Sequence, residues 1–181
     1  MAKLWIRPLH PTAGEAHHDD FATIAAALAA RGAAIERWAP AAAVAPGDPQ
    51  ELVLAAFADD VARISASGGF GAVDVISLGP DHPQAAALRA KFRAEHTHDD
   101  DEIRFFVAGS GLFCMRYDDV VLQVLCEAGE LVRVPAGARH WFDAGPRPSF
   151  VAIRWLGGPD GWVPRYTGSD LADRLPTLDT V

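Results

Sequence analysis

Three histidines and one glutamate stand in two short segments whose spacing suits metal binding. His96 and His98 are separated by one residue, and Glu102 follows after a run of aspartates. Because side chains alternate along a strand, the two imidazoles would share one face, and a turn through the aspartates would bring Glu102 beside them. Downstream, the turn at Pro135–Gly137 would deliver a third imidazole. The sequence therefore predicts one metal site with the ligands His96, His98, Glu102 and His140.

This set of ligands favours a catalytic metal ion over a structural one. Imidazoles and a carboxylate suit first-row divalent ions such as iron, nickel, manganese, cobalt and zinc, whereas structural zinc sites are closed and usually rich in thiolates. In an octahedral site, four protein ligands leave two positions open, which fits a bidentate oxygen chelator. A single carboxylate leaves a divalent ion positively charged, so the expected ligand is a small anionic enediol or diketone. The remaining histidines are interpreted as ordinary polar residues: His10, His17, His18 and His82.

Composition argues against several other classes of protein. The chain has 181 residues, a formal net charge of −8 and a pI of about 5.2, without a basic stripe. Nucleic acid is therefore not an expected partner. The longest apolar runs are too short to span a membrane, and the first residues lack the apolar stretch of a signal peptide. We therefore expect a cytoplasmic protein without a membrane or nucleic-acid partner.

The first half of the chain mixes helices and strands. Helices are expected where apolar residues recur on one face between a capping residue and a glycine or a turn. These helices lie at 20–30, 49–68 and 83–92. Short apolar runs rich in β-branched and aromatic residues predict strands at 4–6, 34–38 and 73–78.

After Glu95 the pattern changes to short β-rich runs separated by turn residues, which is typical of a jelly roll or barrel. Strands are expected at 103–107, 112–117, 120–125, 131–134, 140–142 and 150–156, and a short helix at 169–174. We expect one mainly-β domain with helices (α+β) over residues 1–181. It would comprise an N-terminal α/β segment to about residue 93, a barrel at about 94–156 and a tail at 157–181.

Two cysteines, Cys114 and Cys126, are too few for a scaffold held by disulfides. If Asp118–Asp119 forms a hairpin turn, Cys114 faces Gln123 and Cys126 faces Gly111. The two thiols are then not cross-strand partners. We expect both to be small buried residues in a reducing compartment.

The two metal-binding segments resemble the paired motifs of the cupin superfamily, G-x5-H-x-H-x3,4-E-x6-G and G-x5-P-x-G-x2-H-x3-N. All four ligand positions match, whereas Ala90 and Ala144 stand where the motifs have Gly and Asn. The resemblance implies a cupin double-stranded β-helix, which is a jelly-roll barrel.

Further segments resemble the acireductone dioxygenase family over nearly the whole chain. They lie at 35–38, 74–78, 92–98, 101–107, 111–114, 124–127, 134–137, 140–145, 150–154, 161–162 and 166–168. The resemblance implies a monomeric enzyme of methionine salvage that cleaves acireductone, 1,2-dihydroxy-3-oxo-5-methylthiopentene, with O2. It implies one Fe(II) or Ni(II) per monomer. The iron form would give 4-methylthio-2-oxobutanoate and formate, and the nickel form 3-methylthiopropionate, formate and carbon monoxide.

Two arginines have the chemistry to bind an anionic substrate. Arg104 shares a strand face with Glu102, where a guanidinium would stabilise a substrate dianion. A salt bridge to Asp99–Asp101 is the alternative for this residue. Arg154 lies inside an apolar strand, so its charge must be paired or face a cavity. The resemblance places it at the substrate pocket, and a strand edge facing water is its alternative.

The resemblance also places aromatic side chains near the tail of the substrate. These are Phe92, Phe142 and Trp162, and each could instead be an ordinary core residue. Glu95, which precedes the first ligand, would hydrogen-bond a ligand imidazole or lie at the surface.

The metal-binding residues alone leave two other functions open. A different cupin enzyme, such as an isomerase or another dioxygenase, would use the same ligands but leave the matches at Arg104, Arg154 and Trp162 unexplained. A cupin without catalysis could store or sense a metal or small molecule. Such proteins often lose ligands, so the presence of all four argues against this reading.

Overall fold

The computed structural model describes residues 1–10, 14–158 and 163–181, and more of these residues lie in β-strands than in helices. The longest strand is β6 (Glu102–Arg116). The other strands of the described part are β1 (Lys3–Pro8), β2 (Ala16–His18), β3 (Ala34–Arg37), β4 (Ala72–Leu78), β5 (His96–Thr97), β7 (Val120–Glu127), β8 (Glu130–Val134), β9 (Arg139–Asp143), β10 (Phe150–Leu156) and β11 (Arg165–Tyr166).

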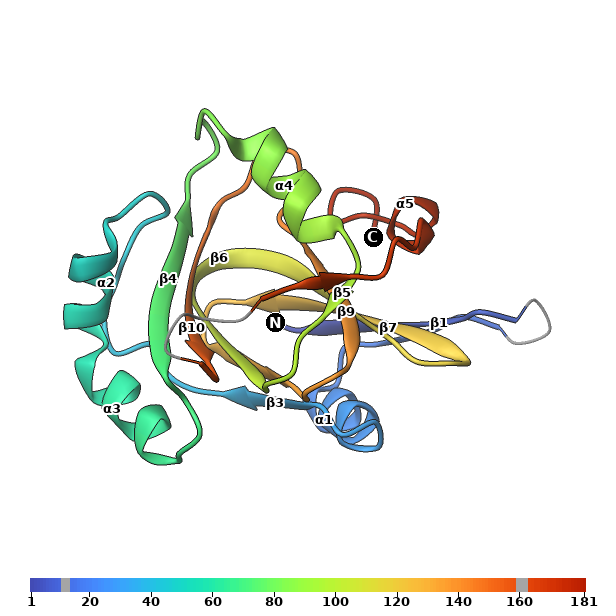
Figure 1. Cartoon of the computed structure of the whole chain (residues 1–181), viewed down its shortest axis with the longest axis horizontal. Coiled ribbons are helices and arrows are strands. Elements are labelled where there is room, and N and C mark those ends of the chain that lie inside the picture. Colours follow the sequence, from blue (N-terminus) through green and yellow to red (C-terminus); the bar gives the residue numbers. More distant parts are fainter. Residues whose placement is uncertain (11–13, 159–162) are drawn as a thin grey trace.

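Two sheets share β6 (Figure 1). One has the strand order β2-β1-β7-β6-β9-β5-β11, and the other has the order β3-β8-β6-β10-β4. The first half of β6 pairs with β8 and β10, and its second half pairs with β7 and β9. The expected mainly-β architecture with helices is confirmed. The pairing of the described strands does not close the sheets into a complete barrel.

Helices border this framework. They are α1 (Phe21–Ala29), α2 (Gln50–Ala56), α3 (Ala58–Ala66), α4 (Ala85–Arg93) and α5 (Leu171–Arg174). Figure 1 shows α2 and α3 beside β4, and α4 at one end of the sheets. The carboxylate of Asp20 caps α1 as expected, because it accepts a hydrogen bond from the backbone N–H of Thr23 at 2.8 Å.

The single helix expected at 49–68 was wrong, since the structure divides it at Phe57 between α2 and α3. Phe57 has φ −114° and is fully buried, with its ring edge-on to Phe105 at 6.0 Å between centroids. The division lets Val53 on α2 and Ile64 on α3 pack into the same apolar cluster as Phe57. Tertiary packing thus overrides a continuous helical pattern.

The two strands expected at 103–107 and 112–117 are one strand, so the turn predicted between them was also wrong. Gly109 marks the point where β6 passes from one sheet to the other. Its φ of +66° is a left-handed conformation, and a Cβ built there would lie 1.8 Å from the backbone oxygen of Ser149. Glycine allows β6 to bend here and lets the backbone at Ser149 approach the strand closely.

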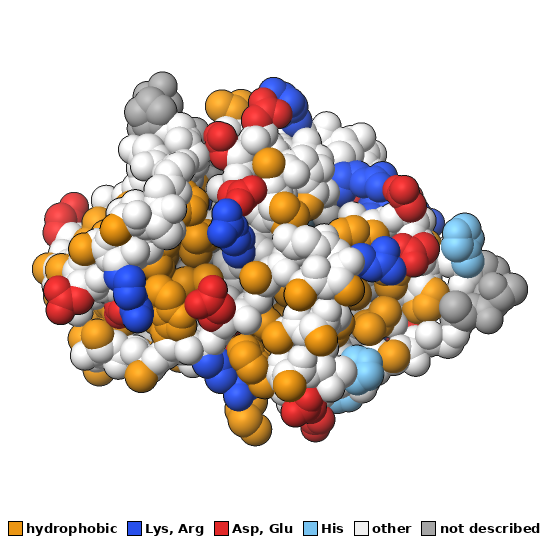
Figure 2. All heavy atoms as spheres, turned by 90° about the horizontal axis from the view of Figure 1, so that it is seen from below, with side chains coloured by type: hydrophobic (Ala, Val, Ile, Leu, Met, Phe, Trp, Pro, Cys, Tyr) orange, Lys and Arg blue, Asp and Glu red, His pale blue; other side chains and the backbone are white. Residues whose placement is uncertain are grey.

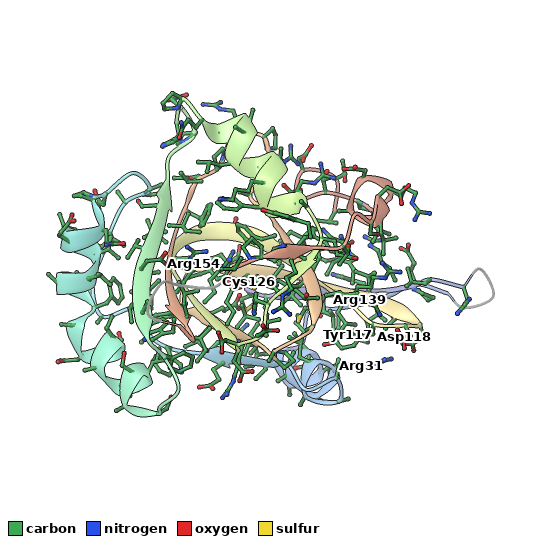
Figure 3. All side chains as sticks on the ribbon, viewed as in Figure 1. Arg31, Tyr117, Asp118, Cys126, Arg139 and Arg154 are labelled. Atoms are coloured by element: carbon green, nitrogen blue, oxygen red, sulfur yellow. The ribbon has the colours of Figure 1, made fainter. Side chains whose placement is uncertain are left out.

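The predicted hairpin register is confirmed for both cysteines. Cys114 pairs with Gln123 and Cys126 pairs with Gly111, and both thiols are free and buried. Figure 3 places Cys126 in the interior of the molecule. On the face drawn in Figure 2, basic and acidic side chains are interspersed among apolar ones. None of the described helices is long and apolar enough to cross a membrane.

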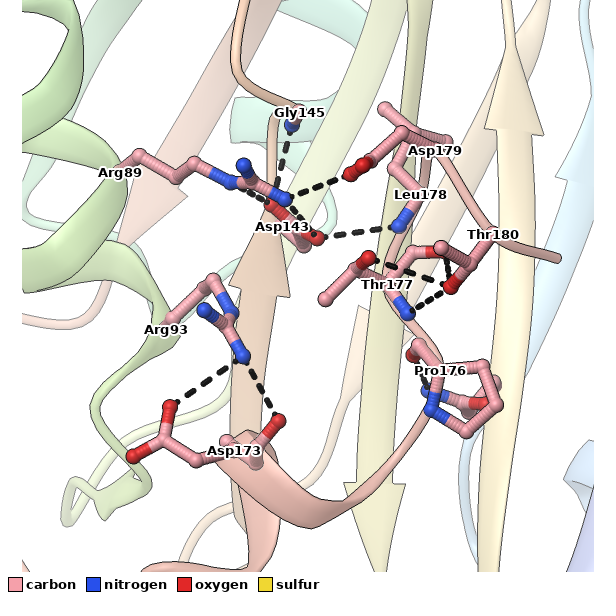
Figure 4. Close-up of polar contacts among 12 residues, drawn as sticks. Arg89, Arg93, Asp143, Gly145, Asp173, Pro176, Thr177, Leu178, Asp179 and Thr180 are labelled. Atoms are coloured by element: carbon pink, nitrogen blue, oxygen red, sulfur yellow. Dashed lines mark hydrogen bonds and ion pairs between the residues drawn. The ribbon is translucent and has the colours of Figure 1, made fainter.

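The C-terminal tail is tied to α4 and β9 through the buried carboxylate of Asp143 (Figure 4). Asp143 accepts hydrogen bonds from Arg89 on α4 at 2.7 and 3.0 Å, and from the backbone N–H groups of Gly145 and Leu178 at 3.0 Å each. Arg89 also donates to Asp179 at 2.8 Å. The network fixes α4, the helix that leads into β5.

We expect Gly109→Ala to destabilise the protein by more than about 3 kcal/mol, because a left-handed alanine is strained and its Cβ would overlap the backbone at Ser149. Gly68→Ala is the matched control. Gly68 has φ +90° but open space around a built Cβ, so this substitution should lower stability by only about 1–2 kcal/mol. Urea unfolding of both variants measures the difference. Equal losses would contradict the close approach at Gly109.

We expect Asp143→Asn to lower stability at pH 7 by about 2 kcal/mol, because the charged acceptor of Arg89 is removed. Burial raises the pKa of Asp143, but hydrogen bonds from Arg89, Leu178 and Gly145 outweigh it and hold the pKa below its ordinary value of 3.8. The stability that the ionised carboxylate contributes to the fold is therefore fully present above pH 3.8. It is lost as the pH falls through the pKa of the folded state.

Urea unfolding at several pH values tests this linkage. The difference between Asp143→Asn and the unaltered protein should shrink below about pH 4. Asp179→Asn is the control, since Asp179 is a half-exposed acceptor of the same arginine. Its replacement should lower stability by less than about 1 kcal/mol. A difference that stays constant with pH would show that the charge of Asp143 does not stabilise the fold.

Candidate active site

The four predicted metal ligands come from three strands and the turn between two of them. His96 lies on β5, where it is the cross-strand partner of His140 on β9. His98 follows β5, and Glu102 begins β6. All four side chains are buried, with residue exposures between 1 and 5 %. The structure therefore places all four side chains in its interior.

Backbone carbonyls fix the orientation of all three imidazoles. Nδ1 of His96 is 2.8 Å from the carbonyl oxygen of Ala94, and Nδ1 of His140 is 2.8 Å from that of Ala138. Nδ1 of His98 contacts the carbonyl oxygen of Asp100. A carbonyl can only accept, so Nδ1 of each ring carries the proton. In this tautomer the lone pair that binds a metal lies on Nε2.

Three of the four residues form a compact group. Candidate ligand atoms of His98, Glu102 and His140 all lie within 4.8 Å of one another. Nε2 of His98 is 3.2 Å from Oε2 of Glu102, whereas Nε2 of His140 is 3.6 Å from it, beyond hydrogen-bond distance. Nε2 of His140 is thus a buried polar atom without a hydrogen-bond partner among the described residues. A metal ion at this position would satisfy it.

His96 stands beside this compact group rather than within it. Its ring centroid is 4.5 Å from that of His140 and 6.3 Å from that of His98. Burial and the neighbouring His140 lower the pKa of His96 to about 4, so the ring is neutral at pH 7. It remains a proposed fourth ligand, with the correct tautomer and a place against His140.

Arg104 balances the buried charge of Glu102. Its Nε and Nη2 donate to Oε1 of Glu102 at 3.1 and 2.6 Å. Burial raises the pKa of Glu102, but the positive charge of Arg104 opposes it, and the pKa lies well below its usual range. The alternative partner expected for Arg104 is engaged elsewhere, since Asp101 accepts from Arg133. Nη1 of Arg104 is buried without a hydrogen-bond partner among the described residues.

A cavity of about 220 Å³ opens beside the imidazoles of His96 and His140. Phe92 from α4 and Phe142 from β9 line it, with 6.3 Å between their ring centroids. Trp162, the third aromatic residue expected here, lies outside the described residues. The cavity therefore joins the candidate metal ligands to an aromatic wall that suits an apolar group.

Arg154 also lines this cavity, from β10 (Figure 3). Its Nε and Nη2 donate to the carboxylate of Asp74 on β4 at 2.9 and 2.6 Å. The side chain of Arg154 is 14 % exposed, so it does not lie at a strand edge facing water. Three cationic side chains line this space, those of Lys91, Arg104 and Arg154, together with the carboxylate of Asp74.

Glu95 has other partners than the imidazole expected from the sequence. Among the described residues, its buried carboxylate accepts hydrogen bonds from Arg116 at 3.2 and 3.3 Å and from the hydroxyl of Thr167 at 2.6 Å. The backbone N–H of Thr167 also donates to the carbonyl of Glu95. Glu95 therefore fastens β11 beside β5, and Tyr166 on β11 faces His96 with 6.0 Å between ring centroids.

Sequence reasoning missed five residues of the cavity wall, which are Asp74, Lys91, Leu156, Pro164 and Tyr166. A signal for Asp74 was present, because it is a charged residue within the apolar strand at 73–78. The same signal had singled out Arg154. No comparable signal marked Tyr166, whose position depends on the pairing of β11 with β5.

Comparisons with known proteins agree with this site. Residues 11–164 match the ARD/ARD' family. The acireductone dioxygenase of Synechococcus sp. (strain RCC307) is 51% identical over 162 residues, which cover 90% of this chain and 88% of that protein. The acireductone dioxygenase of Stutzerimonas stutzeri (strain A1501) is 51% identical over 173 residues, covering 96% of this chain and 94% of that protein.

A solved structure extends the likeness to the fold. It is described as an acireductone dioxygenase from Bacillus anthracis with a cadmium ion in its active centre. The TM-score is 0.74 at 32% sequence identity, and the match covers 92% of this chain and 98% of that one. The expected cupin fold is confirmed, and the chain is an enzyme, a dioxygenase among the oxidoreductases. By sequence and by fold, this chain belongs to the acireductone dioxygenase (ARD/ARD') family.

Proposed function

We propose that this enzyme cleaves acireductone, 1,2-dihydroxy-3-oxo-5-methylthiopentene, with O2 in methionine salvage, using one Fe(II) or Ni(II) ion per chain. The observation that carries the proposal is the buried Nε2 of His140, which has no hydrogen-bond partner in the described part of the chain. It lies beside His98 and Glu102 at the cavity lined by two arginines. Relatives about 51% identical carry the name acireductone dioxygenase, and the Bacillus anthracis protein holds cadmium in its active centre.

The residues present fit a divalent first-row metal. His96, His98, Glu102 and His140 would hold it. Three imidazoles that bind through Nε2 and one ionised carboxylate form a suitable set of ligands for such an ion. A bound Fe(II) or Ni(II) would supply Lewis-acid and redox chemistry for an enediol and O2. Arg104 keeps Glu102 ionised and oriented through its two hydrogen bonds.

The remaining residues of the cavity would bind and orient the substrate. Arg104 and Arg154 supply positive charge for an anionic enediol, and Phe92 and Phe142 supply an apolar wall for its methylthioethyl tail. Trp162 is proposed as a third aromatic contact of the tail. The apolar wall would also limit the access of water to the reacting end of the substrate.

Which products form depends on the metal in this proposal. The iron form would give 4-methylthio-2-oxobutanoate and formate, and the nickel form 3-methylthiopropionate, formate and carbon monoxide. We also propose that the chain acts in the cytoplasm as a monomer of one domain. The single domain is supported by the pairing of β1, β3 and β4 with β7, β8 and β10, which joins the N-terminal segment to both sheets.

The deciding experiment loads the purified enzyme separately with Fe(II) and Ni(II) and supplies acireductone and O2. We expect both forms to consume the substrate, and chromatography of the acids with headspace analysis for carbon monoxide to distinguish the products. If neither form consumes acireductone, the proposed function is wrong. If both forms give the same products, the proposed dependence on the metal is wrong.

The ligand set is tested by metal content. His98→Ala and His96→Ala should each weaken Fe(II) or Ni(II) binding by more than about 100-fold, beyond the loss typical of residues that only support a ligand. His82→Ala is the control and should keep full metal content, since His82 lies in a loop away from the cavity lining. Full metal content in His96→Ala would reduce the site to the three residues that cluster most closely.

A further inference from the structure

The carboxylate of Asp74 holds one edge of the Arg154 guanidinium. Nε of Arg154 donates to Oδ1 at 2.9 Å and Nη2 donates to Oδ2 at 2.6 Å, a bidentate arrangement that fixes both the position and the plane of the group. The two residues are direct cross-strand partners on β10 and β4, and both line the cavity. The pair thus belongs to the wall of the site, where the side chain of Arg154 is 14% exposed and that of Asp74 is 36% exposed.

The register of the strands places a second guanidinium on the other side of Arg154. Arg154 pairs with Asp74 on β4 and with Arg104 on β6, so the three residues form a row across one sheet. Two arginines so close repel each other, and each is bound by its own carboxylate through Nε and Nη2.

We infer that Asp74 is a positioning residue, which orients Arg154 so that the two arginines together bind an anionic chelating substrate. The inference rests on the proposed function and adds a residue to it. A long side chain that is already fixed loses less conformational entropy when it binds an anion. Without Asp74, repulsion from Arg104 would move Arg154 away from the bound anion.

A pair that serves only the fold would behave differently. Arg31 and Asp119 form such a pair, with hydrogen bonds of 2.7 and 2.8 Å, exposed and outside the cavity. Replacing either aspartate removes one bidentate contact to an arginine. Only the replacement at Asp74 should change the affinity for an anion, and Asp119→Asn is therefore the matched control.

The experiment is a double-mutant cycle on the metal-loaded enzyme, with Asp74→Asn, Arg154→Met and the double variant. Two properties are measured: KM and kcat for acireductone, and the dissociation constant of oxalate, a small chelating dianion, by calorimetry. We expect Asp74→Asn to raise KM and the oxalate dissociation constant about tenfold, with kcat within about threefold of the unaltered enzyme. In the Arg154→Met background, the same change should alter both constants less than about twofold.

Two further variants separate positioning from general damage to the fold. Asp119→Asn should leave KM and oxalate binding unchanged. Asp74→Glu keeps the charge and should come closer to the unaltered enzyme than Asp74→Asn does. It also provides the test if Asp74→Asn does not fold.

Three results would overturn the inference. The first is an unchanged oxalate affinity in Asp74→Asn. The second is that Asp74→Asn weakens oxalate binding equally in the presence and absence of Arg154. The third is that the unaltered enzyme does not bind oxalate. An equal loss would mean that Asp74 acts on the anion itself. Failure of the proposed function is distinguishable: if acireductone is not consumed but oxalate binding depends on Asp74 only through Arg154, the positioning role stands.

Discussion

The buried charge of Glu102 sets the conditions for the whole site. The residue is 1% exposed, and an ionised carboxylate in such a place is stable only with charged or hydrogen-bonding partners. Arg104 supplies two hydrogen bonds and the opposite charge. Because Glu102 stays ionised, its carboxylate and the Nε2 atoms of the nearby imidazoles become a site for a cation rather than a set of ordinary buried polar groups.

Strand β6 makes this arrangement possible because it belongs to both sheets. Its first residues carry Glu102 and Arg104 in one sheet, while its second half pairs with β9, which carries His140 in the other. The bend at Gly109 joins these halves in one continuous strand. The spacing between the carboxylate and the third imidazole is therefore set by a backbone that is hydrogen-bonded on both sides.

Elements remote in the sequence complete the cavity. The N-terminal half supplies Asp74 through β4, and α4 supplies Phe92 while being held to the tail through Asp143. The tail strand β11 returns Tyr166 to His96, fastened by Glu95. The metal-binding segments thus depend on both ends of the chain, which is consistent with a likeness to relatives over nearly their full length.

The sequence by itself determined the parts that rest on local geometry. Alternation along a strand and the turns at the aspartates and at Pro135–Gly137 predicted that His96, His98, Glu102 and His140 would lie together, and candidate ligand atoms of the last three lie within 4.8 Å of one another. The predicted hairpin register placed both cysteines. Only the tertiary structure decided the partners of Arg154 and Glu95, the division of the helix at Phe57 and the continuity of β6. The physical reason is that these features depend on the register and packing of segments up to 80 residues apart, which no local pattern specifies.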